Sequence, residues 1–253
     1  MTRLSLELVP RSLASIAEEV ATIGERFAAI DTVNVPDLLR FDLRSWDACG
    51  HARRGIGRAI PHLRAMDFDP VKLAPLLAHL DRHALREVLV VRGDPPQEPG
   101  RAVFPTRSHE LVAALKRARP DLRVYAAIDP YRAGLREELE AAHQKRDAGA
   151  DGFFSQPFFD LRLLAAWADL LEGHDVYWGV TPITGERSRR YWETKNRAVF
   201  PASFAPTLDW SRRFAADALA WARERDANLY FMPIRVDAVQ WLGELALGRT
   251  AGA

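Results

Sequence analysis

The chain has 253 residues, of which 48% are hydrophobic, so it is long enough to bury a large core within one domain. Its 35 basic and 34 acidic side chains give a formal charge of +1, which leaves no overall field to attract nucleic acid or an anionic membrane. The single cysteine, Cys49, excludes an internal disulfide and a Cys-rich metal site built by this chain alone. Because no segment approaches the ~20 apolar residues of a membrane span and no apolar leader follows Met1, we expect a cytoplasmic protein with no membrane or nucleic-acid partner.

Short β-branched or aromatic runs alternate with longer amphipathic stretches along the chain, a pattern typical of repeated βα units around a parallel sheet. The eight expected strands are residues 4–9, 32–35, 59–63, 87–91, 123–128, 152–155, 176–181 and 228–232. The helices expected between them include residues 12–29, 70–83, 108–117, 134–147, 161–171 and 215–225.

Eight such units in about 250 residues predict an α/β fold, a single (β/α)8 TIM barrel in which residues 1–253 form one catalytic domain. No stretch rich in proline and glycine divides the chain. Residues 37–57 contain four arginines and few periodic apolar positions, so we expect a long loop there, placed over the active face.

Polar residues end nearly every expected strand, and in a barrel these strand ends meet at the catalytic mouth. They are Glu7, Asn34, His62, Arg92 with Asp94, Asp129, Gln156 and, after the eighth strand, Arg235. Any one of them could be a solvated strand end or a structural ion pair. The complete ring predicts a functional site.

Glu7 interrupts an apolar strand, where desolvation would raise its pKa toward the range useful for acid catalysis; the alternative is a salt bridge across the barrel. His62 could be a satisfied core imidazole or a ligand contact. Gly93, between Arg92 and Asp94, would let the backbone approach a ligand closely.

Aromatic residues within or just beyond the strands could stack on a flat ligand, although most are expected in the core. They are Tyr131, Phe158, Phe159, Trp178, Tyr191, Trp192 and Phe231. His79 and His83 have the spacing of a helical metal-ligand pair, but we interpret them as a solvated helix face outside the barrel, and expect no metal site.

Together these segments resemble the methylenetetrahydrofolate reductase family from Ser5 to about Arg235. Residues 6–10, Leu-Glu-Leu-Val-Pro, resemble the family's Phe-Glu-Phe-Phe-Pro, and residues 61–63 are similar to its Pro-His-Leu. Residues 91–96, Val-Arg-Gly-Asp-Pro-Pro, resemble Leu-Arg-Gly-Asp-x-Pro. Residues 145–150 and 155–160 resemble Lys-x-Asp-Ala-Gly-Ala and Thr-Gln-x-Phe-Phe-Asp, and residues 179–184 are similar to Gly-Ile-x-Pro-Ile/Val-Ser/Thr. Each motif is short, but their common order is specific.

The resemblance implies a flavoprotein that binds FAD in the barrel mouth. The implied flavin-site residues are His62, Arg92, Gly93, Asp94 and Lys145. Glu7 would be the general acid, with Asp94 also in catalysis, and the residues implied to contact folate are Gln156, Arg235 and the stacking Trp192.

Several positions depart from the family pattern, among them Ile234 in place of the asparagine that precedes the family's arginine. Asn34 is a polar substitute at a flavin position of the second strand, and Tyr131 lies in an altered segment after the fifth strand, from which it could still reach FAD. Phe231 stands where the family has a tyrosine in the eighth strand.

The implied activity is the flavin-dependent reduction of 5,10-methylenetetrahydrofolate to 5-methyltetrahydrofolate, or the reverse, in one-carbon metabolism and methionine biosynthesis. NADH, NADPH or a partner flavoprotein would supply electrons, and a homo-oligomer is compatible with the sequence. The alternatives are a folate-binding barrel without flavin, acting as an accessory or methyl-transfer subunit, and a barrel hydrolase or lyase that uses Glu7 and Asp94 as paired carboxylates.

Overall fold

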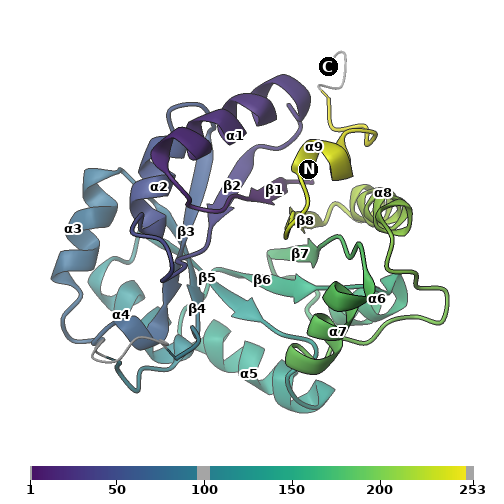
Figure 1. Cartoon of the computed structure of the whole chain (residues 1–253). Helices are drawn as coiled ribbons and strands as arrows, with labels where there is room; N and C mark the ends of the chain where they lie inside the picture. The colour runs from purple at the N-terminus through teal and green to yellow at the C-terminus, as the bar shows by residue number, and fades with distance from the viewer. Residues whose placement is uncertain (1, 96–102, 249–253) are drawn as a thin grey trace.

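The computed structural model describes residues 2–95 and 103–248, in which eight parallel strands close a barrel in the order of the chain (Figure 1). The strands are β1 (Leu4–Glu7), β2 (Thr32–Val35), β3 (Arg58–Arg64), β4 (Glu87–Val91), β5 (Arg123–Ile128), β6 (Gly152–Pro157), β7 (Val176–Val180) and β8 (Asn228–Phe231). The barrel is closed because β1 pairs with both β2 and β8. The expected (β/α)8 TIM barrel is therefore confirmed.

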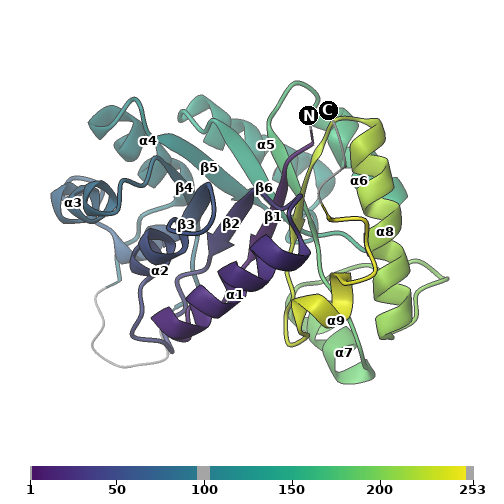
Figure 2. The same ribbon diagram turned by 90° about the horizontal axis from the view of Figure 1, so that it is seen from above.

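Helices surround the barrel on its outer side. They are α1 (Leu13–Arg26), α2 (Ser45–Ala52), α3 (Ala74–Arg82), α4 (Ser108–Ala118), α5 (Leu135–Asp147), α6 (Leu161–Leu170), α7 (Glu186–Lys195), α8 (Leu208–Glu224) and α9 (Ala238–Leu242), with a 3-10 turn at Ala65–Asp67. Figure 2 shows α8 and α9 on the same side of the barrel as α1, so the last βα unit lies against the first. The helix α1 begins where the Ser12 hydroxyl accepts a hydrogen bond from the Ser15 amide at 3.0 Å.

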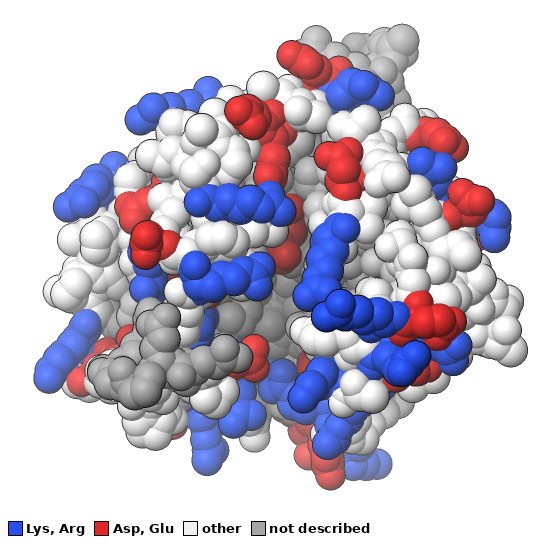
Figure 3. Space-filling model, viewed as in Figure 1, with Lys and Arg blue, Asp and Glu red and all other residues white. Residues whose placement is uncertain are grey.

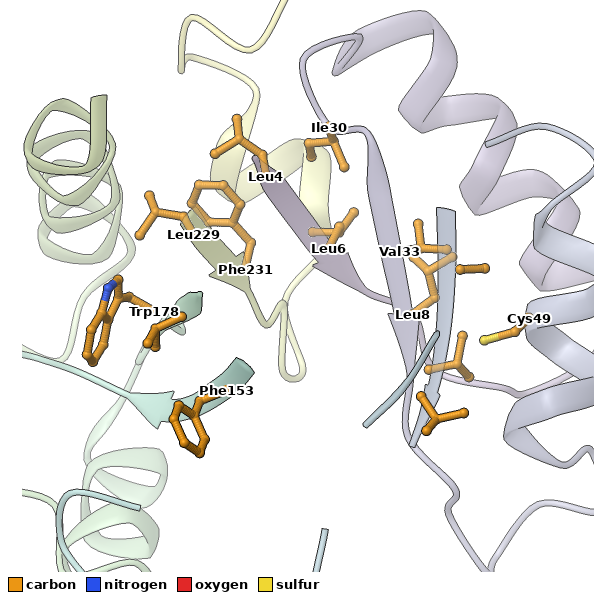
Figure 4. Packing of buried hydrophobic residues seen from close by; sticks show 14 of the residues in the cluster. Leu4, Leu6, Leu8, Ile30, Val33, Cys49, Phe153, Trp178, Leu229 and Phe231 are labelled. Atoms are coloured by element: carbon orange, nitrogen blue, oxygen red, sulfur yellow. The ribbon is translucent and has the colours of Figure 1, made fainter. Parts of the chain in front are cut away.

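Alternation along each strand divides the apolar residues between two clusters. Leu4, Leu6 and Leu8 face the helices, with Val33 and Cys49, in the larger cluster (Figure 4). The barrel interior is filled by a separate cluster of alternate strand residues: Ile60, Leu89, Tyr125, Phe154, Tyr177, Tyr230 and Met232. In β1 and directly after it, Ser5 and Glu7 alternate with the outward-facing Leu4, Leu6 and Leu8, so their side chains share the inner face.

The expected long loop at residues 37–57 is wrong, because α2 occupies its second half. Trp46, Cys49 and Ala52 are buried on one side of this short helix, and Ser45 donates a hydrogen bond to the His62 carbonyl at 2.8 Å. Gly50 is required by close packing, because a β-carbon there would lie 2.2 Å from His83 Nδ1.

The interpretation of His79 and His83 as a solvated face is also wrong. The His79 ring lies 5.4 Å from the Trp46 ring, and His83 Nε2 lies 2.8 Å from an Asp47 oxygen. Both histidines therefore attach α3 to α2. Among the residues that the structure describes, no group of three or more His, Cys, Asp or Glu side chains could hold a metal ion.

Charged side chains close the N-terminal end of the barrel. Asp175 accepts hydrogen bonds from Arg3 at 2.7 Å and from Asn228 at 2.6 Å, and it also pairs with Arg123. These cations hold the pKa of Asp175 below its ordinary value even though its partial burial acts in the opposite direction. This network stabilises the end of the barrel opposite the mouth.

Candidate functional site

Glu7, the last residue of β1, extends into the barrel mouth. Desolvation by the surrounding barrel raises its pKa to about 7, while a hydrogen bond donated by the Tyr230 hydroxyl acts in the opposite direction. No arginine forms an ion pair with Glu7 in the described part of the chain, so the salt-bridge alternative is not what the structure contains. A carboxyl group of this kind is half-protonated near neutral pH and can donate a proton.

Three buried polar side chains from β1, β2 and β3 form a chain of hydrogen bonds beside Glu7. Asn34 donates from Nδ2 to the Ser5 hydroxyl at 2.8 Å, and its Oδ1 lies 2.9 Å from His62 Nε2. Burial lowers the pKa of His62 to about 3, so this imidazole is neutral at physiological pH. Asn34 and His62 are 0% and 6% exposed, respectively.

The turn after β4 brings Arg92, Gly93 and Asp94 to the mouth, while Pro96 of the same motif lies outside the described residues. Gly93 has a φ of +85°, a left-handed conformation that favours glycine. A β-carbon there would lie 3.0 Å from Arg64 Nε. Arg64 in turn donates to the Asp94 carbonyl, so it fixes the turn, whereas the Arg92 and Asp94 residues are exposed.

A hollow of about 530 Å³ lies between the segment before α4 and the inner face of α5. Its lining includes the basic residues Arg92, Arg107, Arg132 and Lys145, the neutral or weakly basic Thr106, Ser108, His109 and Gln144, and one carboxylate, Glu138. Lys145 donates to the Ala127 carbonyl at 2.8 Å, and burial together with nearby Arg132 lowers its pKa to about 8. Glu138 is 7% exposed and has no hydrogen-bond partner among the described residues, while burial raises its pKa. The hollow can accept an anionic group together with a hydrogen-bond donor.

A second hollow, of about 540 Å³, lies between α1 and the segment after β8 and is lined by both Glu7 and Arg235. Both predicted residues therefore line one hollow, but the described residues show no contact between their side chains. Its remaining charged lining is Arg11, Glu18, Glu19 and Asp237, and Figure 3 shows acidic side chains near α1 and α9 and basic side chains gathered over α7. The two sides of the mouth thus differ in charge.

The other predicted contacts are not all equally accessible. Gln156 is partly exposed at the end of β6, on the same face as buried Phe154. Tyr131 is 8% exposed and donates to the Pro157 carbonyl at 3.0 Å, within a cluster of buried residues. Trp192 is in that cluster too, 4% exposed and packed edge-on against Phe159, whereas its neighbour Tyr191 is 54% exposed. Stacking by Trp192 on a ligand requires α7 to move.

Sequence reasoning missed three residues that shape the site. Arg64 is two positions beyond His62 on β3, and Glu138 is seven positions before Lys145 on α5. Both spacings place the two residues on one face of their element, so the sequence could have indicated Arg64 and Glu138 as site residues. For β8 the expected position was wrong by one residue: Phe231 faces the helices and packs against Trp241, whereas Tyr230 faces inward and contacts Glu7. A shift of one residue in a strand reverses its faces.

The chain is similar to known proteins in both sequence and fold. The sequence profile of methylenetetrahydrofolate reductase matches residues 49–211, more than half of the chain. The 5,10-methylenetetrahydrofolate reductases of Escherichia coli strain K12 and Shigella flexneri are each 27% identical over 158 residues, 60% of this chain and 53% of theirs. The chain thus spans about half the length of the curated relatives it matches.

Solved structures show the same fold at low identity. An uncharacterized protein from Clostridium thermocellum that binds two copies of 5-methyl-5,6,7,8-tetrahydrofolic acid superposes with a TM-score of 0.63 at 12% identity, covering 97% of this chain and 93% of its own. A 2,3-dimethylmalate lyase superposes with a TM-score of 0.57 at 12% identity, covering 92% and 75%. No helix in residues 2–95 and 103–248 is long and apolar enough to cross a bilayer.

Proposed function

The chain belongs to the methylenetetrahydrofolate reductase family, and we propose that it catalyses the flavin-dependent reduction of 5,10-methylenetetrahydrofolate to 5-methyltetrahydrofolate, or the reverse reaction, in one-carbon metabolism. The observation that carries the proposal is Glu7: a desolvated carboxyl with a pKa of about 7, held by Tyr230 in a hollow that Arg235 also lines. Opening the imidazolidine ring of the substrate requires a proton on nitrogen, which such a carboxyl can supply.

The residues at the mouth fit FAD. Arg92, Arg132 and Lys145 line one hollow and match a pyrophosphate in charge, while the free carboxylate of Glu138 can accept hydrogen bonds from hydroxyl groups. Bound FAD would supply hydride to the methylene carbon, a reaction that protein side chains cannot perform. The left-handed turn at Gly93 packs its α-carbon against Arg64 and Met66 and so holds the segment between Arg92 and Asp94 in place.

The remaining predicted residues orient the folate. Gln156 offers both a donor and an acceptor to the pterin edge, and Asp94 accepts hydrogen bonds from pterin N–H groups. Arg235 is exposed in the hollow with Glu7, where its guanidinium can pair with a folate carboxylate. Trp192 would stack on the folate only after α7 has moved, and Tyr131 would reach FAD only after leaving its cluster.

We further propose NADH or NADPH as the electron donor, with a partner flavoprotein as the alternative, and a cytoplasmic location in methionine biosynthesis. A homo-oligomer is compatible with these roles. The single barrel domain of residues 1–253 would provide the complete folate site. Each of these points follows from the family rather than from the geometry.

The decisive experiment reconstitutes the purified chain with FAD and measures its absorbance spectrum, then mixes the reduced holoprotein with methylenetetrahydrofolate under anaerobic conditions. Reoxidation of the flavin with formation of 5-methyltetrahydrofolate is the expected result. A protein that takes up FAD but is not reoxidised would contradict the proposed substrate. One that takes up no FAD at saturating concentration would contradict the flavin dependence.

A second candidate function is a folate-binding barrel without flavin, acting as an accessory or methyl-transfer subunit. The observation that favours it is Tyr131, which follows β5, is 8% exposed and donates a hydrogen bond to the Pro157 carbonyl, so that its hydroxyl is engaged within the protein. Isothermal titration with 5-methyltetrahydrofolate in the absence of FAD separates the two candidates, because the second requires tight folate binding by a colourless protein.

A further inference from the structure

Asn34 lies at the centre of the buried hydrogen-bond chain on β1, β2 and β3. Its side-chain amide donates to the Ser5 hydroxyl at 2.8 Å, and its carbonyl oxygen lies 2.9 Å from His62 Nε2. A carbonyl oxygen can only accept, so this contact is a hydrogen bond only if Nε2 carries the proton. With the amide nitrogen toward the Ser5 hydroxyl, the carbonyl oxygen is the end of the amide that faces His62.

Asn34 has little left to offer a ligand. It is 0% exposed, and both its oxygen and its nitrogen are engaged within the protein. His62 differs, because its second ring nitrogen, Nδ1, has no hydrogen-bond partner among the described residues although the residue is only 6% exposed. Among the described residues, Nδ1 is not one of the polar atoms that are both fully enclosed and without a partner, so this nitrogen is open to a ligand or to water in the mouth.

We infer that Asn34 is a positioning residue that fixes His62 in the tautomer with the proton on Nε2, so that Nδ1 is presented to the site as a hydrogen-bond acceptor. The group that binds there must donate, through an N–H or an O–H. Phosphate oxygens only accept, so His62 faces a ring or hydroxyl portion of the ligand. The phosphates belong beside Arg92 and Lys145 in the basic hollow.

The first half of this inference rests on the geometry of three side chains, and the second half, the identity of the ligand, rests on the proposed FAD site. The two halves are therefore tested by separate measurements. Nitrogen-15 NMR of the histidine rings distinguishes the two neutral tautomers from each other and from the imidazolium form. The His62→Gln variant assigns the His62 signals among those of the seven histidines.

We expect the wild-type protein at pH 7, without ligand, to hold His62 almost entirely in the Nε2–H form. Asn34→Leu removes the acceptor and should give a mixture of tautomers, and Ser5→Ala should give a partial change, because it frees the amide to rotate. Thr32→Val is the matched control, because Thr32 is buried on the same strand as Asn34 but its hydroxyl donates a hydrogen bond to Asp31 rather than to Ser5, Asn34 or His62. It should leave the His62 spectrum unchanged.

A wild-type spectrum dominated by the Nδ1–H or imidazolium form overturns the inference, as does an Asn34→Leu protein that keeps the Nε2–H form. If Asn34→Leu does not fold, the wild-type and Ser5→Ala spectra still decide. FAD titration by fluorescence then tests the ligand: Asn34→Leu should bind FAD about 10-fold more weakly than Thr32→Val, the equivalent of one hydrogen bond. If the tautomer behaves as expected but neither protein binds FAD, the proposed function fails and the positioning role stands.

Discussion

At the scale of single residues, Glu7 is held in an environment that disfavours its charge. Its pKa is about 7 in the fold against 4.5 in the unfolded chain, so the folded state binds the proton more tightly between these two values. Folding stability therefore falls as the pH rises from 4.5 to 7, and the full penalty persists above 7. Such a penalty is typical of a group kept for chemistry rather than for stability.

Glu7→Gln retains the shape and the hydrogen bond from Tyr230 but has no proton to give. We expect FAD to bind and to be reduced by its donor as before, while transfer to methylenetetrahydrofolate slows by ~10²-fold or more. Stopped-flow measurement of the two half-reactions checks this. Equal slowing of both half-reactions would assign Glu7 to support of the flavin or of the fold.

The same variant should be more stable than the wild type at pH 8, because the amide carries no charge to desolvate. This advantage should shrink as the pH falls from 7 and disappear near 4.5, where the wild-type carboxyl is protonated in both folded and unfolded states. Melting temperatures across this range provide the measurement. A constant difference between the two proteins would show that the effect does not arise from ionisation.

For Lys145, we predict that the dependence of folding stability on pH has the opposite sign. Its folded pKa of about 8 lies below the ordinary 10.5, so the unfolded chain binds more protons between these values and stability rises with pH across that window. Lys145→Met should therefore melt at a higher temperature than the wild type at pH 7 without FAD, and should bind FAD roughly 10- to 100-fold more weakly because a phosphate partner is lost.

Lys116→Met is the control for this prediction. Lys116, on α4, donates to the Leu122 carbonyl at 3.0 Å and to Asp151 at 3.1 Å, so its removal should lower the melting temperature. FAD affinity should be unchanged, since Lys116 does not line the basic hollow. An equal loss of FAD affinity in both variants would remove Lys145 from the proposed phosphate site.

At the scale of elements, the strands could be predicted from sequence because each is a short segment with apolar residues, most of them β-branched or aromatic, between longer amphipathic stretches. The helix α2 could not be predicted, because its eight residues are too few to show a helical repeat of apolar positions and they include Gly50, which is unfavourable within a helix. Gly50 is explained only by its close contact with His83. The family motif directed attention to Phe231, whereas the inward-facing residue that contacts Glu7 is its neighbour Tyr230. The polar residues at strand ends could be recognised from the sequence, whereas their hydrogen-bond partners could be identified only in the closed barrel.

The junction of β6 and β7 supplies a prediction at this scale. Pairing shifts between Phe154 and Pro157, and the Gly179 amide donates to the Ser155 hydroxyl at 2.8 Å. A β-carbon at Gly179 would lie 2.8 Å from both the Ser155 carbonyl oxygen and Met232 Cε, so Gly179→Ala should lower the free energy of unfolding by about 1–3 kcal/mol.

Gly24→Ala is the matched comparison for that substitution. Gly24 is exposed within α1 and has nothing within 4 Å of an added β-carbon, so alanine should stabilise the helix by up to about 1 kcal/mol. Urea denaturation of the two variants measures both values. Loss of stability in Gly24→Ala similar to that in Gly179→Ala would contradict the steric explanation.

At the scale of the whole molecule, the two ends of the barrel have different tasks. The end at Asp175 satisfies its charges internally, with Arg3, Arg123 and Asn228 around one carboxylate. At the opposite end, Glu138 and His62 Nδ1 have no hydrogen-bond partner within the part of the chain that the structure describes, and Glu7 and Lys145 have shifted pKa values. Ion pairing around a single carboxylate thus marks one end, and ionisable groups with shifted pKa values mark the other.

Asp175→Asn tests this separation. It leaves Arg3 and Arg123 without their counter-charge in a partly exposed network, so we expect the free energy of unfolding to fall by about 1–3 kcal/mol and the melting temperature by roughly 2–10 °C. The effect should diminish at low pH, because the depressed pKa of Asp175 gives stability that is present above 3.8 and lost as the pH falls through the folded value. FAD affinity, measured below the new melting temperature, should match the wild type. A weakened FAD complex would mean that the two ends are coupled through the barrel interior.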